Sequence, residues 1–126
     1  LWVARTGQVG SIGVVAAHVD VSGADAAEGV KWSYIFAGEQ KVDGNPHEPL
    51  SDRARGTIQA DVDSLYGLFV DLVASNRGMS AAAVRATKAR IYRGEAAVTA
   101  GLADAVGTLE DALMAMVEHL DEREAA

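Results

Sequence analysis

The spacing of apolar and polar positions changes about a third of the way along the chain. Residues 9–17 form a short β-branched run between polar residues, which is typical of a strand buried on both faces. Residues 30–37 alternate and predict a second strand. Ser22, three residues before Asp25, predicts the N-cap of a short helix that Gly29 ends. This order fits a parallel crossover unit. The aromatic side chains of the second strand share one face: Trp32, Tyr34 and Phe36.

From residue 51 onward, the apolar positions follow helical spacings. Ser51 is the expected cap of a long helix that ends near Gly78. Ser80 precedes a shorter helix, and Thr108, with Asp111 three residues later, begins a terminal helix. The long helix has apolar positions three or four residues apart: Ile58, Val62, Leu65, Phe69, Leu72 and Val73. Shorter expected elements are a strand at 90–92, a helix at 95–100 and an extended segment at 102–106.

These patterns predict an α/β fold in which parallel βαβ units are followed by a helical C-terminal half. A chain of 126 residues suffices for one buried core. We assign residues 1–120 to one domain and residues 121–126 to a charged tail that frays. The sequence opens at Leu1 inside an apolar run and without a methionine, so we expect it to be part of a longer protein.

Charge and composition exclude several classes of function. Acidic side chains number 18 against 11 basic ones, a formal charge of −7, which argues against a general binder of nucleic-acid backbones. The absence of cysteine removes disulfides, thiolate nucleophiles and cysteine zinc sites. No apolar run approaches the roughly 20 residues of a membrane-spanning helix. We expect no metal and no other cofactor.

Two weaker patterns are better explained by structure than by ligands. His18 and Asp20 have the spacing of two metal ligands, but alternate residues near a turn are more often simply hydrogen-bonded. Gly7, Gly10 and Gly13 resemble a phosphate-binding loop, but they lie before and within a strand and not at the start of a helix. Neither pattern predicts a bound metal or nucleotide.

Residues 37–50 contain both prolines and two glycines, and they predict a loop at the end of a strand. Ligands and chemistry collect at this end of open α/β sheets. Lys41 lies in this loop. A lysine acts as a base only when its amine is neutral, which requires the amine to be removed from water. From residue types alone, Lys41 is therefore one candidate catalytic residue.

Five segments, in order and at matching spacing, resemble the C-terminal part of a signal peptide peptidase A (SppA) type serine protease domain. They begin Thr6-Gly7-Gln8-Val9-Gly10-Ser11-Ile12-Gly13-Val14 and Ala37-Gly38-Glu39-Gln40-Lys41-Val42-Asp43-Gly44-Asn45-Pro46, and continue with residues 69–78, 94–97 and 100–104. The resemblance covers about residues 1–113 and is greatest to the branch that includes phage and prophage head proteases.

The resemblance implies a ClpP/crotonase-like fold and a serine endopeptidase that uses a Ser/Lys dyad. Lys41 matches the general base of the family, and Ser11 matches a serine whose hydroxyl orients that lysine. The family carries its nucleophilic serine upstream of the matched region. We therefore expect the fragment to be inactive alone.

The resemblance also implies partners and a location. The substrate would be a polypeptide, possible partners are capsid or scaffold proteins, and relatives form homo-oligomeric rings or domes. The expected location is the phage prohead or the bacterial cytoplasm, or a membrane if an upstream segment carries an anchor. Two alternatives remain open: a bacterial peptidase that degrades cleaved signal peptides, and a non-catalytic oligomerisation or scaffold module. The aromatic face of residues 30–37 and the apolar seam of the long helix either form subunit contacts or fill the core of the protomer.

Overall fold

The computed structural model describes residues 1–124, and the chain divides into two compact units. The first unit comprises residues 1–13 together with the chain from residue 68 onward, and the second comprises residues 14–67. Helix α2 (Asp52–Arg77) contributes residues to both units. The protein is a mixed α/β structure.

Two small sheets organise the first unit. Strand β1 (Trp2–Val3) pairs in parallel with β4 (Ala105–Val106), although the two strands are about a hundred residues apart in sequence. Strand β2 (Gln8–Gly10) pairs antiparallel with β3 (Ile91–Arg93), and Val9 lies opposite Tyr92. Both sheets therefore bring the first ten residues against the last third of the chain.

The core of the first unit is built around the short helix α4 (Glu95–Thr99). Ala97 of this helix is completely buried and packs with Val3 and Ala103. Small side chains at these positions allow the helix and the strands to approach closely. Four partly buried side chains complete the cluster: Val9, Tyr92, Val98 and Val106.

Arg77, the last residue of α2, ties this helix to the segment before β4. Its Nε donates to the carbonyl oxygen of Gly101 at 2.9 Å, and its Nη2 donates to Oδ1 of Asp104 at 2.6 Å. A further bond joins Nη1 to Oδ2 of Asp104 at 3.1 Å. The guanidinium thus binds the carboxylate of Asp104 in a bidentate manner, which the single amine of a lysine could not do.

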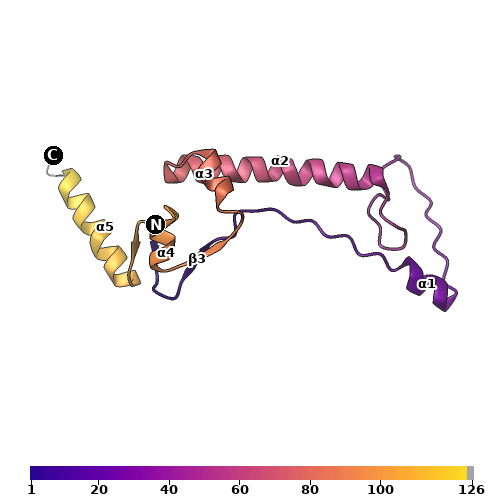
Figure 1. Ribbon diagram of the computed structural model, residues 1–126, viewed down its shortest axis with the longest axis horizontal. Helices are drawn as coiled ribbons and strands as arrows, with labels where there is room; N and C mark the ends of the chain where they lie inside the picture. The colour runs from indigo at the N-terminus through magenta and orange to yellow at the C-terminus, as the bar shows by residue number, and fades with distance from the viewer. Residues whose placement is uncertain (125–126) are drawn as a thin grey trace. The chain divides into compact units, whose positions relative to one another are not determined.

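The second unit has little apolar core of its own. Within residues 14–67, Ala54 is the one fully buried residue. Helix α1 (Ser22–Glu28) and the first part of α2 are joined by long irregular segments (Figure 1). The unit therefore depends on hydrogen bonds within its loops, which are described with the candidate site.

The predicted helices are confirmed, and so are their ends apart from the start of the first helix. Ser51 Oγ accepts from the backbone of Ala54 at 3.2 Å, and α3 (Ala81–Ala86) begins with the same bond from Ala83 to Ser80. Thr108 and Asp111 form a reciprocal capping box at the start of α5 (Leu109–Glu124). Gly29 and Gly78, which were expected to end two of the helices, are left-handed, and so is Gly101 after α4.

The two strands predicted in the first third are wrong. Of residues 9–17 only the start belongs to a strand, β2, and residues 30–37 contain none. The predicted parallel crossover therefore does not form in the described chain, and the parallel pairing is instead that of β1 with β4. A β-branched run becomes a strand only when another strand accepts its hydrogen bonds, and within residues 1–124 none is aligned with 14–20.

The cap predicted for the first helix is also wrong. Ser22 is the first residue of α1 and the N-cap position is Val21. Both the backbone N–H and the hydroxyl of Ser22 donate to Oδ1 of Asp20, at 2.9 and 2.6 Å. These hydrogen bonds lower the pKa of the Asp20 carboxyl, the one to the Ser22 hydroxyl most strongly.

The apolar faces of the two longest helices are open in the described chain. On α2, Leu65 and Leu72 are exposed. On α5, five apolar side chains are exposed as well: Leu109, Leu113, Met116, Val117 and Leu120. Trp32 and Phe36 are also about half exposed. Within residues 1–124 these exposed side chains are not covered by a core, and whether they form subunit contacts stays a prediction. Helix α5 continues through Glu124, so part of the predicted tail is helical, and residues 125–126 lie outside the described residues.

None of the helices in the described part of the chain combines the length and apolar character needed to cross a bilayer.

The Arg77 contact predicts a pH-dependent contribution to stability. Hydrogen bonds from the guanidinium hold the pKa of the Asp104 carboxyl well below its usual value of 3.8. A depressed folded pKa stabilises the fold above the unfolded pKa, and this stabilisation is lost as the pH falls below it. Because Asp104 is 53% exposed, Asp104→Asn should lower the free energy of unfolding by only about 1 kcal/mol at pH 7.

Urea unfolding at pH 7 and at pH 3 measures this effect. The difference between the native chain and Asp104→Asn should shrink at the lower pH. Asp71→Asn, at an exposed position of α2, is the matched control and should show no such pH dependence. An equal difference at both pH values would contradict the role assigned to the ion pair.

Candidate functional site

Lys41 lies in a series of tight turns, as predicted for residues 37–50. Its backbone N–H donates to the carbonyl of Gly38 at 3.0 Å, and that of Asp43 donates to Gln40 at 3.2 Å. The Lys41 side chain is exposed, and within residues 1–124 its amine has no hydrogen-bond or ion-pair partner. The second unit thus orders the backbone of Lys41 and leaves its amine open to a partner.

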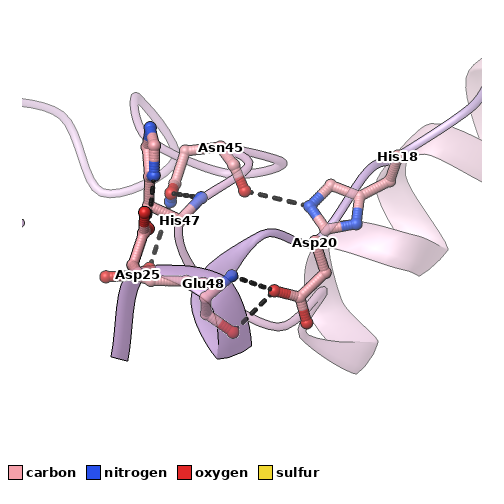
Figure 2. Close-up of polar contacts among 7 residues, drawn as sticks. His18, Asp20, Asp25, Asn45, His47 and Glu48 are labelled. Carbon is pink, nitrogen blue, oxygen red and sulfur yellow. Dashed lines mark hydrogen bonds and ion pairs between the residues drawn. The ribbon is translucent and has the colours of Figure 1, made fainter. Parts of the chain in front are cut away.

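Asn45 is the hub of this loop (Figure 2). Its Nδ2 donates to the carbonyl of Val42 at 3.0 Å and to Oε2 of Glu48 at 3.1 Å. Its Oδ1 accepts from the backbone N–H of His47 at 2.9 Å. Its own carbonyl accepts from Nε2 of His18 at 2.9 Å, so that ring nitrogen carries a proton. One asparagine therefore links four points of the second unit.

His47 connects the loop to helix α1. Its Nδ1 lies 2.7 Å from Oδ2 of Asp25, and both side chains are about four-fifths buried. The ring of Trp32 stacks on the imidazole at a centroid distance of 3.9 Å and an interplanar angle of 21°. Tyr34 stacks in turn on Trp32 at 6.4 Å. The aromatic face predicted for residues 30–37 is thus partly real, although the segment is not a strand.

A second tie joins the loop to the start of α2. Nη2 of Arg53 donates to Oδ1 of Asp43 at 2.9 Å. Arg53 lies in the first turn of the helix, so the ion pair fixes the loop against the helix N-terminus. Val42 and Asp43 are therefore both anchored by side chains, and Lys41 directly precedes this anchored pair.

Ser11 occupies a strained position in the first unit. Its φ of 55° lies in the left-handed region, which a serine rarely adopts. Its backbone N–H donates to the carbonyl of Arg90 at 3.0 Å, and Lys88 and Ala89 just before Arg90 are left-handed as well. Three strained non-glycine residues therefore lie in two neighbouring segments. Strain of this kind persists only where the surrounding structure enforces it.

Comparison with known proteins identifies the family. The family model described as Peptidase family S49 matches residues 1–123. The chain belongs to peptidase family S49.

Two of the relatives of this S49 chain come from phages. The capsid assembly protease C of Escherichia phage lambda is 39% identical over 121 residues, which are 96% of this chain and 28% of that protein. The head-tail preconnector protein GP5 of Enterobacteria phage P21 is 37% identical over 119 residues, or 94% of this chain and 24% of that protein.

A third relative comes from a bacterium. A protein of Enterococcus faecium described as a signal peptide peptidase SppA is 38% identical over 105 residues, or 82% of this chain and 30% of that protein. This S49 chain therefore spans about a quarter to a third of the length of these relatives. The resemblance to SppA-type proteases and phage head proteases is confirmed.

The structure assigns the two predicted catalytic residues of the S49 chain to different units, Ser11 to the first and Lys41 to the second. The meeting of their side chains stays a prediction. The hydrogen-bonded interpretation of His18 and Asp20 is confirmed, because each has a partner. Within residues 1–124, no three histidine, aspartate or glutamate side chains gather as a metal site would require.

The contacts of four residues in the S49 chain were not predicted from the sequence: Asn45, Arg77, Asp25 and His47. Asn45 and Arg77 lie inside segments that match the family, but nothing in the spacing shows which partners they contact. The pairing of Asp25 with His47 spans 22 residues and crosses two irregular segments. One signal in the sequence pointed to such a contact. His47 follows Pro46 in the loop, where a histidine ring is ordered only if it has a hydrogen-bond partner.

Gly10 permits the turn that carries Ser11, and its replacement gives a test. A Cβ at Gly10 would lie 2.3 Å from the carbonyl oxygen of Arg90, and its φ of 118° is unfavourable for other residues. Gly10→Ala should therefore destabilise the first unit by about 2 kcal/mol or more in urea unfolding. Gly23→Ala, with open space around the new methyl, is the control. Equal stabilities would show that the close approach of Gly10 to Arg90 tolerates the change.

Proposed function

We propose that this chain supplies the general base, Lys41, of a serine endopeptidase with a Ser/Lys dyad. The observation that carries the proposal is the match to peptidase family S49 over residues 1–123, which includes the ordered loop of Lys41. In this proposal the nucleophilic serine belongs to a part of the protein outside these residues, within a ClpP/crotonase-like domain. The fragment alone is then inactive.

The chemistry follows from the two side chains. The neutral amine of Lys41 takes the proton of the serine hydroxyl as its oxygen attacks the peptide carbonyl. The amine then returns this proton to the leaving nitrogen as the peptide bond breaks. Because Lys41 is exposed in the second unit, the desolvation that keeps its amine neutral must come from other parts of the protein or from a neighbouring copy.

Ser11 is proposed to orient the lysine. A neutral amine has one lone pair, which must face the nucleophile, and two protons, which need acceptors. A hydroxyl held by a strained backbone is a fixed acceptor for one of these protons. The close contact of the Ser11 backbone with Arg90 supports such a fixed position.

The whole protein is proposed to act in phage or prophage head maturation, cutting capsid or scaffold proteins. The two phage relatives, whose names refer to capsid assembly and to the head-tail preconnector, support this choice. The relative described as a signal peptide peptidase favours the alternative, a bacterial enzyme that degrades cleaved signal peptides. The open apolar faces of α2 and α5 support a homo-oligomer.

A pair of substitutions at Lys41 tests the mechanism in the full-length protein. Both Lys41→Ala and Lys41→Arg should reduce peptide hydrolysis by about a thousandfold, because the guanidinium keeps the charge but does not deprotonate. Assembly, measured by size-exclusion chromatography, should be unchanged. Lys31→Ala is the control, because Lys31 is an exposed lysine of the same unit. Activity retained in Lys41→Arg would remove Lys41 as the base, and a full-length protein without any peptidase activity would favour a scaffold module.

Ser11→Ala separates orientation from proton transfer. Loss of one hydrogen bond to the amine should lower kcat by about tenfold, which is far less than the loss at Lys41. Steady-state kinetics on the same peptide give the comparison. A loss as large as that of Lys41→Ala would mean that Ser11 has a more direct part in the reaction.

A further inference from the structure

The loop that carries Lys41 is fastened at a point away from the lysine itself. Three hydrogen bonds join residues 42–47 to the chain before them. The His18 ring donates to the carbonyl of Asn45, the His47 ring donates to Asp25, and the backbone N–H of Val21 donates to the carbonyl of Pro46 at 2.8 Å. We propose that Asp25, acting through His47 and Asn45, is a positioning residue for Lys41. This inference rests on the proposed role of Lys41 as the general base.

The path from Asp25 toward Lys41 consists of three hydrogen bonds, of which Figure 2 shows the two made by His47. Nδ1 of His47 donates to Oδ2 of Asp25 at 2.7 Å, since an ionised carboxylate only accepts. The backbone N–H of His47 donates to Oδ1 of Asn45 at 2.9 Å, and Nδ2 of Asn45 donates to the carbonyl of Val42 at 3.0 Å. Val42 directly follows Lys41, so the path ends on the carbonyl of the next residue in the chain.

The environment of His47 makes this path stiff. The imidazole lies between the carboxylate of Asp25 and the ring of Trp32, and its side chain is only 20% exposed. A charge-assisted hydrogen bond in a site with little water is stronger than one at the surface. The hydrogen bond to Asp25 therefore fixes the direction in which Nδ1 points, and the stacking on Trp32 fixes the plane of the ring.

A rigid backbone next to Lys41 matters because a lysine base is flexible. The amine sits on a flexible four-carbon stem, and the order that the second unit provides is in the backbone turns around Lys41. A displacement of about 1 Å between reacting groups can cost about a hundredfold in rate. Fixing the carbonyl of Val42, the residue after Lys41, limits such displacements without any contact of Asp25 or His47 with the substrate.

The test uses the full-length protein with a peptide substrate. Asp25→Ala should lower kcat by about ten- to a hundredfold with KM changed less than about twofold, because the base is misplaced but substrate binding is not. Asp25→Asn should recover most of this loss, since its amide oxygen still accepts from Nδ1 of His47. Glu28→Ala, which removes an exposed carboxylate from the same helix, is the matched control and should leave kcat unchanged.

Each outcome decides the proposal. It is overturned if kcat of Asp25→Ala equals that of Glu28→Ala, or if Asp25→Asn is as slow as Asp25→Ala. Should Asp25→Ala fail to fold, His47→Phe replaces it, because phenylalanine still stacks on Trp32 but cannot donate to Asp25. The same loss of kcat is then expected, and an unchanged kcat overturns the proposal. Activity retained in Lys41→Arg would instead overturn the proposed base.

Discussion

The second unit depends on the side-chain amide of Asn45. An apolar core does not hold this unit, since Ala54 is the one residue in 14–67 that is fully buried. The amide instead bonds to three other residues of the loop, and the carbonyl of the same residue receives a fourth bond from His18. Hydrogen bonds are directional, so they fix a geometry more narrowly than apolar contacts of equal strength.

The first unit is held differently. There, alanine and valine side chains pack around α4, and Arg77 fastens the end of α2 to Asp104 and Gly101. The strained turn at Ser11 is enforced by this packed frame, through its bond to Arg90. Ser11 is thus held in a packed frame, whereas Lys41 is held in a hydrogen-bonded loop.

The sequence predicted the helices well and the first strands poorly. Helix ends are set by local chemistry, such as the bond of Ser51 to Ala54 and the capping box of Thr108 with Asp111, and local chemistry can be seen in a short window of sequence. The strands at 9–17 and 30–37 required partners at a distance, which the described chain does not supply.

The candidate site was predictable only in part. Lys41 and Ser11 were selected by their resemblance to a family, and the turns around Lys41 followed from prolines and glycines. The partners that hold the loop could not be predicted, because Asp25 and His47 meet only after two irregular segments have folded back on each other. Nothing in the residue types shows which of the three histidines forms a hydrogen bond with the carboxylate of Asp25.

The extended segment at 14–20 has a practical consequence for anyone who produces this chain. Its backbone lies outside every strand of the described residues, and Val15 and Val19 are exposed beside it. Free N–H and C=O groups flanked by valines are a template on which strands of other molecules can add. Expressed alone, the polypeptide will tend to self-associate through this edge, and a longer reading frame or a lysine in place of Val15 is the sounder starting point for crystallisation.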